Sequence, residues 1–140
     1  MFKKKVEKVK MSGKVTPETT GYAAYAFVVP LRDSVSPLCL IRTLENSGFP
    51  CFLVFHDHDT DPYGRRKFYH YHVMVLYDEE KTAAPVVELC NAVCGSGPQI
   101  VHNPRAFARY LCHLDNPDKY QYSLKEVFCI NGCIYEEFIK

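Results

Sequence analysis

The sequence lacks any apolar stretch of about 18 residues or more, so it predicts no membrane-spanning segment. Its basic start, MFKKKVEKVKMSGKVTPETTG, also lacks the apolar region that follows the basic residues of a secretory signal. No internal repeat or low-complexity segment is present. We interpret residues 1–21 as a basic lead-in that could be flexible, and residues 22–140 as one domain. A chain of 140 residues that is 47% hydrophobic has enough apolar mass for a core.

Paired cysteine motifs are absent as well. The seven cysteines are an odd number, and no two of them form a CxxC pair. Cys90 and Cys94 are four residues apart, as are Cys129 and Cys133, so each pair could share a helix face and the four could hold zinc. The favoured interpretation is a set of reduced, mostly buried thiols in a cytoplasmic protein.

The chain has little net charge. A formal charge of +1 argues against a protein that binds nucleic acid through bulk electrostatics alone. A local basic surface is still compatible with that value, because the basic residues gather in groups. These groups are Lys3, Lys4, Lys5, Lys8, Lys10 and Lys14 at the start, Arg65, Arg66 and Lys67 in the middle, and Arg105 and Arg109 later.

Hydrophobic patterns predict an α+β fold. Strands are expected over residues 22–30, 51–55 and 68–77, with a shorter strand near 98–102. Helix start signals stand at Ser36-Pro37 and Asn103-Pro104, and a further helix is expected from Ala84 to Val93. The last 17 residues could hold a short strand and a final helical turn. This order predicts a two-layer sandwich, a mostly antiparallel central sheet with helices packed on it.

The strand FYHYHVMVLY, residues 68–77, carries two histidines in an apolar run. Because side chains alternate along a strand, His70 and His72 share one face with Met74, while Tyr71 and Val73 face the other way. Two imidazoles spaced in this way can converge on one metal ion. The alternative is a pair of hydrogen-bonded core histidines, and the strand alone does not decide between them.

The segment FHDHDTD supplies further candidate ligands. His56 directly follows the buried strand 51–55, and Asp59 lies three residues later. If this strand and the histidine strand are neighbours, His56 and Asp59 come close to His70 and His72. Imidazoles favour zinc and late transition metals, whereas a carboxylate and a phosphate substrate suit manganese or magnesium, so the ligands alone do not identify the ion.

The helix after Pro104 presents Phe107, Tyr110, Leu111 and Leu114 at helical spacing. This places Tyr110 at or beside the apolar face that is directed toward the sheet. A core tyrosine is one interpretation. If the helix covers the face that carries His70 and His72, the phenol hydroxyl instead lies near a metal ion.

Four stretches together resemble the HUH endonucleases, and among them the catalytic domains of rolling-circle plasmid replication initiators. They are YAFVVP, FPCFLVFHDHDTDPYG, KFYHYHVMVLY and FARYLCHLDNPDKYQYS, and the resemblance covers roughly residues 22–125. It implies a ferredoxin-like variant of the α+β fold. It also implies that His56, Asp59, His70 and His72 bind Mn²⁺ or Mg²⁺ and that Tyr110 is the nucleophile. This chain has His58 where the usual HDKD pattern has its lysine, so either His56 or His58 could bind the ion. The family pattern and the position of His56 at the strand end favour His56.

The resemblance further implies that the domain nicks single-stranded or extruded origin DNA through a 5′-phosphotyrosine intermediate. His58 and His113 are auxiliary candidates in this chemistry, and a longer form of the protein could assemble as a homo-oligomer. A catalytically silent origin-binding regulator and a different metallohydrolase with Tyr110 in its core are the alternatives. The candidate DNA contacts are Arg65, Arg66, Lys67, Arg105, Arg109 and Lys119.

Overall fold

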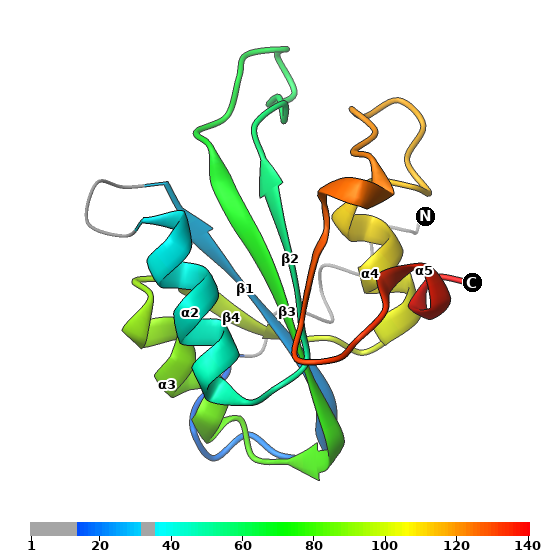
Figure 1. Ribbon diagram of the computed structural model, residues 1–140. Coiled ribbons are helices and arrows are strands. Elements are labelled where there is room, and N and C mark those ends of the chain that lie inside the picture. The colour runs from blue at the N-terminus through cyan, green and yellow to red at the C-terminus, as the bar shows by residue number, and fades with distance from the viewer. Residues whose placement is uncertain (1–13, 32–35) are drawn as a thin grey trace.

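The computed structural model describes residues 14–31 and 36–140, so residues 1–13 of the predicted lead-in lie outside the described residues. A five-stranded antiparallel sheet forms its centre, with the strand order β4-β1-β3-β2-β5 (Figure 1). The strands are β1 (Tyr22–Pro30), β2 (Cys51–His56), β3 (His70–Lys81), β4 (Ser96–Ile100) and β5 (Phe128–Ile130). The helices are α2 (Pro37–Ser47), α3 (Ala84–Ala92), α4 (Pro104–Leu111) and α5 (Tyr135–Phe138), with a 3₁₀ turn η1 (Leu124–Glu126).

Local signals in the sequence determine where two of the helices begin. The Ser36 side chain accepts the Cys39 backbone N–H, and Pro37 occupies the first turn of α2. Asn103 caps α4 in the same manner, accepting the Ala106 N–H at 3.0 Å. Both predicted helix starts are confirmed.

Helices α2 and α3 cover one face of the sheet (Figure 1). The buried side chains of this face include Tyr25 and Phe27 from β1, Leu53 from β2, and Val73 and Val75 from β3. They alternate with residues that point to the opposite face, as the period of two along a strand requires. The predicted division of residues 71–77 between two faces is therefore confirmed.

The opposite face lies under α4 and α5 (Figure 1). Here Phe52 and Val54 of β2 and Met74 of β3 pack with Ala108 and Leu111 of α4. The α4 helix thus covers the same face of β3 that carries the two histidines. None of the helices in the described ranges has both the length and the apolar character needed to cross a membrane.

The α+β class and the antiparallel sheet with packed helices are confirmed. The arrangement extends beyond the predicted two layers, since helices lie on both faces of the sheet. The physical reason is that β1, β2 and β3 carry apolar side chains on both faces, and each face needs cover from water.

Candidate metal and nucleophile site

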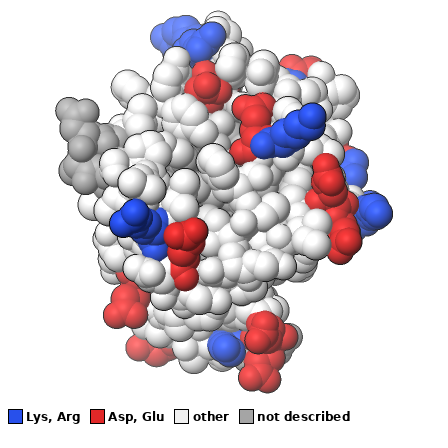
Figure 2. Space-filling model, viewed as in Figure 1, with Lys and Arg blue, Asp and Glu red and all other residues white. Residues whose placement is uncertain are grey.

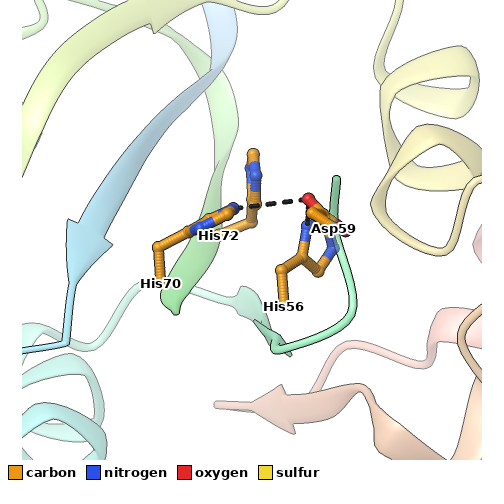
Figure 3. A group of neighbouring side chains, drawn as sticks. All are labelled: His56, Asp59, His70 and His72. Carbon is orange, nitrogen blue, oxygen red and sulfur yellow. Dashed lines mark hydrogen bonds and ion pairs between the residues drawn. The ribbon is translucent and has the colours of Figure 1, made fainter. Parts of the chain in front are cut away.

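Antiparallel pairing of β2 with β3 brings the predicted ligands together. His56 pairs with His70 across the two strands, and Val54 pairs with His72. The chain then turns back after His56, which places Asp59 beside His56 and within reach of His70, with His72 close by (Figure 3). The potential ligand atoms of His56, Asp59, His70 and His72 all lie within 4.8 Å of one another. Among the residues that the structure describes, no other group of this kind occurs, and the seven cysteines remain separate free thiols.

Backbone carbonyls orient two of the imidazoles. His56 Nε2 lies 2.7 Å from the Leu111 carbonyl oxygen, and His70 Nδ1 lies 2.8 Å from that of Phe68. A carbonyl oxygen only accepts, so these two ring nitrogens carry the hydrogens. The other nitrogen of each ring faces the same oxygen, Asp59 Oδ2. His56 Nδ1 lies 3.0 Å from this oxygen and His70 Nε2 lies 3.5 Å from it.

This geometry fits a metal ion. Two ring nitrogens with available lone pairs and one carboxylate oxygen converge, and each ring is fixed through its other nitrogen, as is usual for metal-binding histidines. Without a cation, lone pairs would face a carboxylate unless one histidine were protonated. Either a cation or a protonated histidine would satisfy this contact, and a cation would in addition have His72 within reach as a ligand.

The electrostatics of the group favour a positive charge at its centre. Burial alone would raise the pKa of the Asp59 carboxyl, but the Tyr122 hydroxyl and the hydrogen bonds that His56 and His70 make to the carboxylate as protonated rings hold that pKa well below its ordinary value. The hydrogen bond to Asp59 raises the pKa of His70. Burial, with the nearby His56 and His70, lowers the pKa of His72 well below its ordinary value, so His72 stays neutral and able to bind a metal.

Tyr122 belongs to this group, although the sequence did not single it out as a site residue. Its hydroxyl donates to Asp59 Oδ1 at 2.7 Å and accepts the backbone N–H of His58 at 3.0 Å. Its ring is stacked on His56, with centroids 4.4 Å apart and planes at 4°. Tyr122 lies 63 residues from Asp59 in the chain. Only 2% of its surface is exposed, and this burial arises from tertiary packing. No local sequence signal distinguishes it from Tyr120.

Tyr110 projects from α4 beside the histidines. Its ring centroid lies 6.1 Å from that of His72, and its hydroxyl makes no hydrogen bond to any described residue. Burial, and secondly the charge of Asp59, raise the pKa of this phenol. The side chain is half-buried, so a protonated and unengaged phenol lies at the edge of the group formed by His56, Asp59, His70 and His72, here called the ligand group.

His113 lies two residues after the end of α4 and is buried, with 3% of its surface exposed. Its backbone has a φ of 61°, in the left-handed region that is uncommon for residues other than glycine. Nδ1 donates to the Tyr120 carbonyl at 2.8 Å, so Nε2 carries the lone pair. The ring centroid lies 5.7 Å from that of Tyr110 and 5.1 Å from that of His56. Burial lowers the pKa of His113, which keeps the imidazole neutral.

A pocket of about 570 Å³ joins Asp59 of the ligand group to Tyr110. The β2–β3 loop forms one wall, and α4 with the segment after it forms the other. The lining includes His58, Asp59, Lys67, Tyr110, Lys119 and Tyr120. Asp59 and Tyr110 therefore open into one space that a phosphate of a nucleic acid could enter.

The basic residues of the β2–β3 loop lie around this pocket. Lys67 lines it, whereas Arg65 pairs with Asp61 at 3.0 Å and Arg66 donates to the Asp57 carbonyl. All three are exposed. In Figure 2, Lys and Arg gather at the top of the molecule, where Figure 1 places the β2–β3 loop, and the rest of that face mixes both signs of charge.

The basic residues of α4 are engaged within the chain. Arg109 makes a bidentate contact with Asp115, at 2.9 Å for each of the two closest N–O pairs, and donates to the Ile139 carbonyl at 3.0 Å. Arg105 donates to the Lys140 carbonyl oxygen. Lys119, after the helix, places Nζ 5.9 Å from the Tyr110 ring centroid. Lys119 is thus near Tyr110, while the two arginines contact the C-terminal segment.

Comparison with known proteins identifies the family. Residues 21–135 match the family described as plasmid replication protein, origin binding domain. A replication protein of Staphylococcus aureus is 32% identical over 85 residues, which cover 61% of this chain and 43% of that protein. Replication protein RepB of Lactiplantibacillus plantarum is 34% identical over 77 residues, which cover 55% of this chain and 35% of that protein. The matched segments span less than half of each relative. The predicted resemblance to plasmid replication proteins is confirmed, and the chain belongs to the plasmid replication protein origin-binding domain family.

Proposed function

We propose that this domain is a metal-dependent endonuclease that nicks and rejoins single-stranded origin DNA to initiate rolling-circle replication. The observation that carries the proposal is the convergence of His56, Asp59, His70 and His72 beside the unengaged Tyr110 hydroxyl. Mn²⁺ or Mg²⁺ held by these four side chains would polarise the scissile phosphate and offset the charge of the transition state. The chain's own residues supply the nucleophile, its base and the substrate contacts.

Tyr110 attacks the scissile phosphorus through its phenol oxygen. The new bond is a 5′-phosphotyrosine, the bond to the 3′ oxygen breaks, and that oxygen takes a proton from solvent to become a 3′-OH that can prime synthesis. The covalent link retains the energy of the phosphodiester, so reversal of the step rejoins the strand. The phenol must lose its proton, and neutral His113, with its Nε2 lone pair free and its ring 5.7 Å away, is placed to accept it.

The nucleophile is tested directly by replacing Tyr110 with phenylalanine. The wild-type protein, incubated with Mn²⁺ and a labelled single-stranded oligonucleotide from the cognate origin, should yield a covalent adduct on a denaturing gel. Tyr110→Phe removes the only atom that forms the bond, so the adduct should disappear while oligonucleotide binding remains. Cleavage by the Tyr110→Phe protein would instead favour a metallohydrolase in which the histidines activate water.

The ligand assignment is tested in the same assay. His70→Ala and His72→Ala each remove one of the four converging side chains, so each should lose metal-dependent cleavage by at least about tenfold. Wild-type cleavage rates in either variant would contradict the assignment. Cys39→Ala serves as the matched control, because this exposed thiol lies on α2, on the other side of the sheet.

A second candidate function is a catalytically silent regulator that binds the origin. The family description favours it, because that description refers to origin binding alone. Such a protein would keep the fold and the basic β2–β3 loop without a need for the Tyr110 hydroxyl. Wild-type protein that binds origin DNA in the presence of Mn²⁺ yet never forms an adduct would support this candidate.

A further inference from the structure

Two aromatic rings form an exposed stack in the wall of the pocket. The His58 and Tyr120 rings lie 4.1 Å apart at their centroids, with planes at 7°. The two residues are 62 positions apart in the chain. His58 belongs to the wall formed by the β2–β3 loop and Tyr120 to the wall formed by the segment after α4, so the stack joins the two walls. His58 keeps 39% of its side-chain surface exposed and Tyr120 keeps 44% of its residue surface exposed. Burial of the core therefore does not account for the stack.

The surrounding contacts hold this stack in place. His58 Nδ1 lies 2.7 Å from Asp57 Oδ1, and the His58 backbone N–H donates to the buried Tyr122 hydroxyl. On the other wall, the Tyr120 carbonyl accepts from His113. The Tyr120 ring also contacts that of Tyr122 edge-on at 4.7 Å. A planar surface fixed in this way loses little side-chain entropy when another ring stacks on it.

The position of the stack indicates which ligand it can take. It shares the pocket with Asp59 and Tyr110, where the proposed function places the scissile phosphate, and with Lys67 and Lys119, which can contact neighbouring phosphates. A nucleobase attached to those phosphates is a planar ring that can lie on an aromatic side chain. In a duplex the faces of the bases are covered by their neighbours, so an unpaired base fits this surface.

We propose that the His58–Tyr120 stack is a platform for an unpaired nucleobase beside the scissile phosphate of single-stranded DNA. This inference rests on the proposed function for the location of the phosphate. It assigns to His58 a role in holding substrate and leaves the metal to His56, Asp59, His70 and His72. The platform explains why two partly exposed rings are kept parallel in a polar pocket.

The test separates base stacking from phosphate attraction. Two labelled single-stranded probes of equal length are compared by fluorescence anisotropy in EDTA, one oligo(dT) and one fully abasic. Wild-type protein should bind oligo(dT) about tenfold more tightly than the abasic strand. Tyr120→Ala and His58→Ala should remove this preference while leaving affinity for the abasic strand unchanged, and Tyr120→Phe should retain it.

The outcomes are distinct from those of the cleavage assay, because no metal and no bond breaking are involved. Equal loss of affinity for both probes in Tyr120→Ala would overturn the platform, as would an unchanged preference. A wild-type protein that binds the two probes equally, or neither, would overturn it as well. Melting curves of the alanine variants at Tyr120 and His58 should match that of the wild type, because both side chains are partly exposed. A match excludes misfolding as the cause of a lost preference.

Discussion

At the residue scale, Tyr122 determines how the Asp59 carboxylate faces the three histidines. Its hydroxyl donates to Asp59 Oδ1, while Oδ2 faces His56 and His70. Tyr122→Phe keeps the ring stacked on His56 and removes only that hydrogen bond. We expect Mn²⁺ affinity to fall by roughly tenfold or more, as is typical when a partner of a metal ligand is lost. Titration followed by electron paramagnetic resonance measures the change.

Tyr120→Phe is the matched control for this prediction. It removes a tyrosine hydroxyl from the same segment, but that hydroxyl makes no hydrogen bond to any described residue. Its Mn²⁺ affinity should equal that of the wild type. Equal affinities for Tyr122→Phe and Tyr120→Phe would show that the bond to Asp59 does not influence the metal.

The difference between His72 and Tyr122 shows which site residues a sequence can reveal. His70 and His72 are two residues apart on one strand, so alternation alone places them on one face. Tyr122 reaches Asp59 across 63 residues, and no periodicity encodes such a contact. Arg109 is a similar case, since its sequence suggests a phosphate contact and only the fold brings Asp115 and Ile139 to its guanidinium.

At the element scale, α4 carries the proposed nucleophile, Tyr110, and has only eight residues. A helix this short depends on its caps, because nucleation is costly and few hydrogen bonds propagate it. The Asn103 side chain accepts the Ala106 N–H at 3.0 Å at the start of the helix. Asn103→Ala should destabilise the domain by about 1 kcal/mol in urea unfolding, and Asn103→Asp, which can still cap, should cost much less. Equal stabilities of the two variants would contradict this role.

The end of α4 depends on α5. The Tyr135 hydroxyl donates to the Ala108 carbonyl. In a continuing helix the Cys112 backbone N–H would donate to this carbonyl, but here it donates to the carbonyls of Arg109 and Tyr110. Tyr135→Phe leaves a buried carbonyl without this partner, so we expect a loss of about 1–3 kcal/mol of unfolding free energy. The nicking rate should fall more than oligonucleotide affinity, because Tyr110 lies two residues from Ala108. An unchanged urea midpoint would refute the contribution of this hydrogen bond.

The elements differ in how far the sequence determines them. The caps at Ser36 and Asn103 are local signals, and both helices begin where these signals stand. β3 starts at His70 and not at residue 68, since Phe68 remains 93% exposed and the antiparallel pairing with β2 begins opposite His56. The cover of the second sheet face by α4 and α5 arises from contacts distant in the chain, which a periodic pattern does not specify.

At the scale of the whole molecule, the ligand group lies where two neighbouring strands and a loop meet. His56 ends β2, His70 and His72 open β3, and Asp59 belongs to the loop between them. The unfolded chain does not hold these side chains within 4.8 Å of one another, so a metal ion bound by them would favour the folded state. The same strands form the centre of both apolar clusters, which couples the site to the stability of the domain.

This coupling predicts that metal ions raise the melting temperature of the domain. At a Mn²⁺ concentration 100 times the dissociation constant, binding to the folded state alone adds about 2.7 kcal/mol, which corresponds to several degrees. Differential scanning calorimetry with and without Mn²⁺ measures the shift. Tyr110→Phe should show the wild-type shift, because the phenol is outside the ligand group, whereas His72→Ala should lose most of it. An equal shift in His72→Ala and the wild type would mean that Mn²⁺ stabilises the fold from another site.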